Sequence, residues 1–202
     1  DSLQHANDFV RLIHDQEMDA IVQGYDWSTL CGKTLIDIGG HHGQVAGAIA
    51  DAVPAINCMC LDLPSVISKA PDRKNVQMIP GNVFDTSTIP QCDVILLKHF
   101  LDRCMWNDNE TVEILQNCHA ALISRNGMLV IAEAVLPDYG KVNEETKLQL
   151  YMDALYMLVG RERQRTKMEW QEIARKAGLD ILEIRATKVP SCSLIILSPA
   201  KE

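Results

Sequence analysis

A glycine-rich turn follows the first apolar run of the sequence, and its residue types are suited to binding a nucleotide. Residues 37–43 read Asp-Ile-Gly-Gly-His-His-Gly. A dinucleotide fingerprint, G-x-G-x-x-G, that began at Gly39 would need glycines at His41 and Gln44, so the fingerprint is absent and a nicotinamide oxidoreductase is disfavoured. Gly39 and Gly40 still permit a tight turn and close approach of the backbone. The turn therefore suits a ligand with one adenosine and no phosphate.

Two carboxylates accompany this turn. Asp62 ends the next apolar run, where it could accept hydrogen bonds from both ribose hydroxyls of a nucleoside. Its alternative role is to cap the helix expected after it. Asp37 immediately precedes the glycines, where it could hold a ligand ammonium or a water bound to it. An adenosine joined to an amino acid describes S-adenosylmethionine, and Leu63, beside Asp62, belongs to the same expected site.

Short apolar runs alternate with helical patterns from residue 34 onward, which predicts an α/β domain. Continuous apolar strands separated by helices form parallel sheets covered on both faces. The last two strands have too short a connection for a parallel crossover, so we expect an antiparallel C-terminal hairpin. The prediction is a mostly parallel, seven-stranded Rossmann-like sheet. Its strands are expected at 34–39, 56–64, 76–81, 93–100, 127–135, 179–186 and 192–198, with main helices at 44–53, 110–123, 144–159 and 166–178.

The chain divides into two expected parts. Residues 1–33 have a loosely helical pattern that is too short to make a domain by itself, so we expect the chain to be a fragment of something longer. Residues 34–202 form the cofactor-binding domain. Capping-box patterns at Asn107–Glu110 and Thr166–Glu169 predict two helix starts.

Composition excludes several classes of protein. The net charge is -8 and the basic residues are scattered, so no nucleic-acid surface is expected. No apolar run is long enough to span a bilayer, so we expect no membrane partner. The seven cysteines form no spaced ligand set, which predicts no metal site and a reducing, cytoplasmic location.

Seven motifs occur in the order found in one enzyme family. Their sequences are LIDIGGHHG, CLDLPSV, PGNVF, DVILLKHFL, LVIAEAVLP, YMLVGRER and RTKMEW. Together they resemble the plant-type small-molecule O-methyltransferases, a family that includes caffeate and acetylserotonin O-methyltransferases. The resemblance covers nearly the whole chain from about Phe9 and implies a class I methyltransferase fold. It also implies S-adenosylmethionine as cofactor without metal, a small-molecule acceptor, and a homodimer in the full-length protein. Members of the family dimerise through an extra N-terminal domain, so the resemblance implies that residues 1–33 are a remnant of, or a link to, a missing dimerisation domain.

The resemblance assigns further cofactor residues. Asn82 and Val83 fall where the family has an acid and an apolar residue at the adenine, and the amide oxygen of Asn82 could still accept from the adenine amino group. Lys98 matches a family lysine that contacts the cofactor, and Gly39 lies under the methionine part. His41 replaces a family glycine, so it either narrows the pocket or turns outwards.

The catalytic motif departs from the family. Relatives have a histidine after the fourth strand that deprotonates the acceptor hydroxyl, because a neutral hydroxyl is a poor nucleophile. Counting from Lys98 puts Asp102 at this position, whereas counting back from Trp106 puts Cys104 there. We expect Asp102 to act as the base, with His99 as a helper.

Two supporting acids of the family are matched unevenly. Glu133 stands where one belongs, and a charge that ends an apolar strand indicates a function. The second position is Gln164 or Glu162, depending on the register.

The sequence does not identify the acceptor molecule. We expect the helix at 144–159 to line its site, with Met152, Tyr156 and Met157 as contacts. Oxygen is the acceptor atom that the resemblance implies. The alternatives are transfer to sulfur, nitrogen or carbon without a histidine base, where proximity carries the rate, and a domain that binds the cofactor without methylating.

Overall fold

The computed structural model describes residues 2–102, 106–137, 144–159 and 164–200. Side chains on the first half of helix α1 and at several positions of helix α5 lie outside the described part.

The core of the molecule is one seven-stranded sheet in the order β3-β2-β1-β4-β5-β9-β8. Strands β1 to β5 are parallel, while β9 is antiparallel to both β5 and β8. This confirms the predicted Rossmann-like α/β fold with its antiparallel hairpin. The strands are β1 Thr34–Ile38, β2 Asn57–Asp62, β3 Val76–Pro80, β4 Val94–Lys98, β5 Met128–Glu133, β8 Leu179–Ala186 and β9 Ser193–Pro199.

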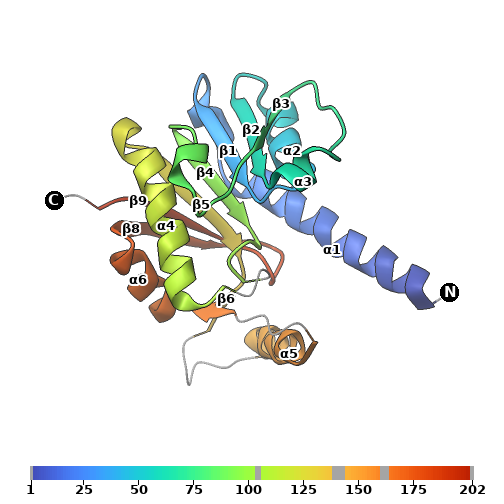
Figure 1. Cartoon of the computed structure of the whole chain (residues 1–202). Helices are drawn as coiled ribbons and strands as arrows, with labels where there is room; N and C mark the ends of the chain where they lie inside the picture. Colours follow the sequence, from blue (N-terminus) through green and yellow to red (C-terminus); the bar gives the residue numbers. More distant parts are fainter. Residues whose placement is uncertain (1, 103–105, 138–143, 160–163, 201–202) are drawn as a thin grey trace.

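Helices cover both faces of the sheet (Figure 1). One face carries α4 (Asp108–Leu122) and α6 (Lys167–Lys176), and both predicted capping boxes are present at their starts. The other face carries α1 (Ser2–Gly24) and α2 (Gln44–Ala52), with the short α3 (Pro64–Ile67) beside β3.

The sheet separates two apolar clusters. Ile36, Ile95 and Leu97 point toward α4 and α6, whereas Leu35 and Leu96 point toward α1 and α2. Both faces of the parallel strands are thus buried, which explains why these strands are apolar throughout rather than alternating.

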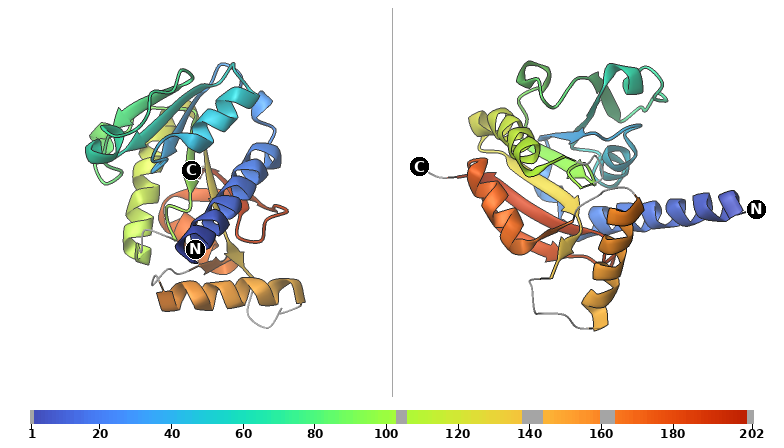
Figure 2. Two further views of the ribbon diagram at one scale, coloured as in Figure 1. Left: turned by 90° about the vertical axis from the view of Figure 1, so that its right-hand side faces the viewer. Right: turned by 60° about the horizontal axis from the view of Figure 1, so that its bottom comes forward.

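The N-terminal helix joins the second cluster through its last turns, and its first half projects beyond the sheet (Figures 1 and 2). Ile21 on α1 and Trp27 in the following 3-10 turn (Trp27–Leu30) are buried. Arg185 Nη1 on β8 donates to the carbonyl of Gly24 at 2.5 Å. The end of α1 is therefore fixed to the sheet.

A second, two-stranded sheet was not predicted. Strand β5 ends at Glu133, earlier than expected, because Val135–Leu136 (β6) turns away to pair with Arg165–Thr166 (β7). Helix α5 (Glu144–Val159) lies beside β6, beyond the carboxyl end of β5 (Figures 1 and 2). The small sheet thus brings the end of β5 and the start of α6 together.

Candidate active site

Two adjoining cavities open where the parallel strands end. One has a volume of about 520 Å³ and the other about 490 Å³, and both are lined by Gly39 and His41. The first extends over the ends of β2 and β3, past Asp62 and Asn82. The second extends toward the end of β4, past Lys98. Ligands of open α/β sheets bind at this edge.

The glycine turn forms the floor shared by the two cavities. Gly39 has φ +71°, and a Cβ there would overlap the ring of Phe100. A Cβ on Gly40 would lie 2.5 Å from Oδ2 of Asp37. Both glycines are therefore required by geometry, and the backbone of the turn is open to a ligand.

Asp62 is held by backbone donors. Its Oδ2 accepts from the N–H of His41 at 2.9 Å, and its Oδ1 accepts from the N–H of Leu63 at 2.7 Å. The cap of α3 is Leu63, which makes no side-chain capping bond, so Asp62 does not cap this helix. Each carboxylate oxygen retains a lone pair for a ribose hydroxyl.

His41 lies in the site rather than away from it. The residue is exposed, lines both cavities and stacks on His42 with ring centroids 3.9 Å apart. Its φ of +54° is the left-handed conformation that the family glycine would adopt without strain.

Asn82 and Val83 lie at the far side of the first cavity, as does Leu63. The Oδ1 of Asn82 accepts from the N–H of Phe84 at 3.1 Å, and Val83 is buried. The side-chain oxygen of Asn82 thus already has one donor, and its second lone pair faces no other described donor.

Three aromatic residues of this cavity were missed by the sequence analysis. Trp106 lies against Phe84, with ring centroids 5.1 Å apart, and against Phe100 at 6.2 Å. All three line the first cavity. Phe100 follows directly on the fourth strand, which was a usable signal, whereas the position of Trp106 depends on the segment that departs from the family.

Asp37 and Lys98 lie on the second cavity. Burial raises the pKa of Asp37 to about 7; an amide hydrogen bond from Ala46 and the charge of Lys98 lower it, and the charge of Asp62 raises it. Asp37 Oδ2 has no hydrogen-bond partner among the described residues. This buried acceptor is available to a donor in the cavity.

The end of β4 carries a buried charge network. Lys98 Nζ contacts Oε2 of Glu17 at 2.8 Å, and His99 Nε2 contacts Oε1 of Glu17 at 2.9 Å. His99 Nδ1 faces Oδ2 of Asp102 at 3.2 Å. The alternation of side chains along β4 does not give the direction of the His99 side chain, because the backbone turns at His99 with φ +45°. Glu17, on α1, was missed by the sequence analysis.

Glu133 lies next to this network at the end of β5. Its Oε1 accepts from the N–H of Leu101 at 2.7 Å. Burial and the charge of Asp102 raise the pKa of Glu133 to about 8, against the opposing charges of His99 and Arg165. Glu133 Oε2 and Asp102 Oδ1 are buried without a partner in the described structure. The predicted catalytic residues His99, Asp102 and Glu133 are thus brought together.

Arg165 binds described residues on both sides of residues 103–105. Its guanidinium donates to the carbonyls of Leu101 and Trp106, at 3.2 and 3.3 Å, and to Oδ1 of Asp108 at 3.2 Å. Arg165 is 2% exposed and lies over the ring of Trp170. Cys104, the other candidate base, lies outside the described residues.

The second acid position is occupied by Gln164 in one register. Gln164 is buried, its N–H donates to Oδ1 of Asp153 at 3.1 Å, and its side-chain oxygen lacks a partner among the residues described. Glu162, the alternative, lies outside the described residues.

Helix α5 carries the expected acceptor contacts. Met157 is half exposed on this helix. The side chains of Met152 and Tyr156 lie outside the described part of the chain.

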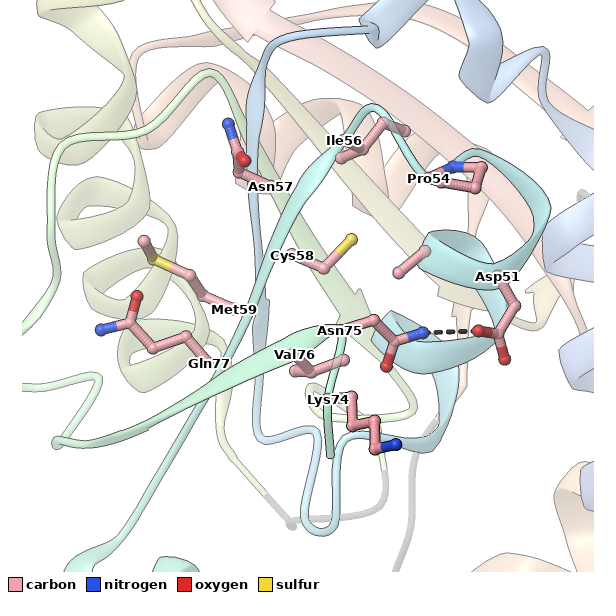
Figure 3. Close-up of a pocket in the computed structure, with 11 residues that line it drawn as sticks. Asp51, Pro54, Ile56, Asn57, Cys58, Met59, Lys74, Asn75, Val76 and Gln77 are labelled. Carbon is pink, nitrogen blue, oxygen red and sulfur yellow. Dashed lines mark hydrogen bonds between the residues drawn. The ribbon is translucent and has the colours of Figure 1, made fainter. Parts of the chain in front are cut away.

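A third hollow, of about 640 Å³, lies at the opposite edge of the sheet, at the amino ends of β2 and β3. Its side chains come from Asn57 to Met59, from the end of α2 and from Lys74 to Gln77 (Figure 3). The amide of Asn75 donates to Asp51 at 2.5 Å, so these two groups satisfy each other. The hollow has neither the glycine turn nor the buried, unpaired carboxylate oxygens of the other edge.

Among the residues described, no group of three or more His, Cys, Asp or Glu side chains could hold a metal ion. None of the described helices is long and apolar enough to cross a membrane.

Comparison with known proteins identifies the family. Residues 4–180 match the family model described as the O-methyltransferase domain. The chain is 33% identical over 160 residues to flavonoid 7-O-methyltransferase 1 of Ocimum basilicum, which covers 79% of this chain and 46% of that protein. It is 37% identical over 156 residues to acetylserotonin O-methyltransferase 3 of Oryza sativa subsp. japonica. This alignment covers 75% of this chain and 41% of that protein.

Solved structures agree on the fold. The mitomycin 7-O-methyltransferase MmcR superposes with a TM-score of 0.77 at 24% identity, over 92% of this chain and 53% of that chain. CalO1, a methyltransferase of calicheamicin biosynthesis, superposes with a TM-score of 0.80 at 22% identity, over 99% of this chain and 59% of that chain. The chain spans less than half the length of the curated relatives named above. Within that span, the fold and the matched residues show that the chain belongs to the O-methyltransferase family.

Proposed function

We propose that this chain is the catalytic domain of an S-adenosylmethionine-dependent methyltransferase that acts on an oxygen of a small molecule. The observation that carries the proposal is the row of Gly39, Asp62 and Asn82 at the ends of three neighbouring strands, beside two adjoining cavities. The family match over residues 4–180 supports the same function.

The cavities fit the cofactor residue by residue. Asp62 offers two carboxylate oxygens for the ribose, and the aromatic residues Phe84 and Trp106 offer apolar surface for the adenine. The unpaired Oδ2 of Asp37 suits the cofactor ammonium, directly or through water. Lys98, on the wall of the second cavity, is suited to the cofactor carboxylate. When bound, the cofactor supplies a methyl group on a positively charged sulfur.

Asp102 is the base in this proposal, because counting from Lys98 puts it at the position of the family histidine. Its Oδ1 is buried and unpaired in the described structure, whereas both ring nitrogens of His99 already face carboxylates. Oδ1 would take up the proton of the acceptor hydroxyl, which would make that oxygen a competent nucleophile for the methyl group that the bound cofactor would supply. A carboxylate is a weak base, so an acidic phenol is a better acceptor than an aliphatic alcohol.

Glu133 supports this step in its neutral form. A pKa of about 8 keeps it protonated at neutral pH, so it adds no second negative charge beside Asp102. Its proton lies on a carboxyl whose Oε2 is unpaired among the described residues, and it could be donated to the acceptor. Met152, Tyr156 and Met157 on α5 remain the proposed acceptor contacts.

The setting of the whole protein is part of the proposal. Family resemblance supports a homodimer in the full-length protein, with residues 1–33 as a remnant of, or a link to, a dimerisation domain. The cysteine pattern supports a cytoplasmic location. The relatives named for flavonoids and acetylserotonin favour an aromatic, hydroxyl-bearing acceptor.

A methyl-transfer screen tests the proposal. The chain is incubated with S-adenosylmethionine and matched panels of phenols, aliphatic alcohols, thiols and amines, and the methylated product is identified by mass spectrometry. The expected result is an O-methylated phenol. Methylation of thiols or amines alone would contradict the oxygen assignment. A melting temperature raised by NAD and not by S-adenosylmethionine would contradict the cofactor.

A further inference from the structure

A carboxylate from the N-terminal helix lies in the middle of the charge network at the end of β4. Glu17 is 0% exposed, whereas Asp15, Gln16 and Asp19 near it on α1 are exposed. Its Oε2 contacts Lys98 Nζ at 2.8 Å, while its Oε1 accepts from Ser191 Oγ at 2.7 Å and faces His99 Nε2 at 2.9 Å. One side chain therefore joins α1, the end of β4 and the turn between β8 and β9.

The ionisation of Glu17 fixes the hydrogen on His99. Burial opposes the charge on Glu17, but hydrogen bonds and charges of His99 and Lys98 outweigh burial and bring its pKa well below the ordinary value. An ionised carboxylate can only accept hydrogen bonds. The Nε2 of His99 must therefore carry a hydrogen toward Glu17. Asp102 is ionised when it acts as the base, so Nδ1, which lies 3.2 Å from its Oδ2, must carry a hydrogen toward it as well.

The backbone of His99 requires support of this kind. Its φ of +45° is a conformation that non-glycine residues rarely adopt, and it persists only where the surroundings impose it. The N–H of His99 donates to the carbonyl of Ala132 at 3.1 Å. Glu17 holds the ring end of the same residue, so the backbone and the side chain are fixed from opposite sides.

We propose that Glu17 is a positioning residue of the acceptor site, which holds the His99 ring so that Nδ1 orients Asp102. The proposal rests on the proposed function, in which Asp102 is the base. Through its other oxygen, Glu17 also holds Lys98 at the wall of the cofactor cavity. The N-terminal helix thus contributes to both halves of the site.

Nuclear magnetic resonance of the histidine rings tests this directly. The chain has six histidines, so the Nε2–H signal of His99 in ¹⁵N-histidine-labelled protein is assigned by its loss in His99→Phe. In the wild type we expect a downfield signal that exchanges slowly with water. Glu17→Gln should shift this signal and speed its exchange by at least about tenfold, because the anionic acceptor is gone.

The matched control is Asp19→Asn, which removes an exposed carboxylate from the same helix. It should leave the His99 signal unchanged. If Glu17→Gln folds and the His99 signal keeps its position and exchange rate, the proposal is wrong. If burying Lys98 without its partner unfolds the single variant, Glu17→Gln/Lys98→Met removes both charges and is measured in its place.

Turnover provides the second readout. Glu17→Gln should lower kcat by about ten- to a hundredfold at saturating cofactor, because the base is no longer aimed, and Asp19→Asn should not. Unchanged kcat with a displaced His99 signal would also overturn the positioning role. If the wild type methylates no acceptor, the proposed function fails, whereas the ring signals still decide whether Glu17 holds His99.

Discussion

The two halves of the site are built differently. On the cofactor side, Asp62 is held by the backbone N–H groups of His41 and Leu63, and the turn is shaped by Gly39. On the acceptor side, His99 and Asp102 are held largely by other charged side chains. The first half depends on backbone geometry and the second on mutually dependent charges.

This difference matters for substitution. A backbone donor survives a change of side chain, so the cofactor half tolerates His41 where the family has glycine. A buried charge that loses its partner is strongly destabilised, so the residues of the acceptor half must change together.

The largest expected effect comes from Asp102→Asn. The amide cannot take up the acceptor proton, so kcat should fall by about a hundred- to ten-thousandfold in a single-turnover assay. Turnover close to that of the wild type would show that Asp102 is not the base, and that the acceptor is activated in another way.

The next effect separates the cofactor side from the opposite edge of the sheet. Asp62→Ala removes two charge-assisted hydrogen bonds to the ribose, and the Kd for S-adenosylhomocysteine should rise by about ten- to a hundredfold in calorimetry. The matched control is Asp51→Ala in the hollow of Figure 3, which should leave the Kd unchanged. Equal losses in both variants would place the cofactor elsewhere.

The pH dependence of stability tests the acceptor side. The pKa of Glu133 is raised from 4.5 to about 8, so between these values the folded state binds more protons than the unfolded state. Stability therefore falls as pH rises through this window.

Glu133→Gln mimics the protonated form and removes this term. The free energy of unfolding of the variant minus that of the wild type should therefore increase as the pH rises. The expected increase is up to about 1.4 kcal/mol per pH unit between about pH 5 and 8, measured in denaturant titrations. Asp37, whose pKa is also raised, contributes equally to both proteins. A difference that stays constant with pH would mean that Glu133 is ionised in the folded protein.

The smallest effect is expected for His41→Gly. Glycine keeps the N–H that binds Asp62 and suits the φ of +54°, so the Kd for S-adenosylhomocysteine should change by less than about threefold. A tenfold change would show that the imidazole itself contacts the cofactor.

The sequence was sufficient for the sheet and for most helix starts. Long apolar runs such as 34–38 and the capping boxes at Asn107 and Thr166 are local signals, and the structure contains each of them. The pairing of β6 with β7 was missed because two-residue strands carry no periodicity.

The acceptor side was less predictable for a physical reason. A lone acid on an amphipathic helix, such as Glu17, is expected to face water, and only the packing of α1 against β4 shows otherwise. The direction of His99 depends on a left-handed turn at a residue that is not glycine, which no pattern in the sequence indicates. The roles of Asp102 and Glu133 stay predictions.

One calorimetric titration tests the separation of the two halves most directly. S-adenosylhomocysteine is titrated into the wild type, Asp62→Ala and Asp102→Asn under identical conditions. The account predicts micromolar binding to the wild type, binding weakened by about ten- to a hundredfold in Asp62→Ala, and an unchanged Kd in Asp102→Asn. No binding to the wild type, or an equal loss in both variants, would contradict it.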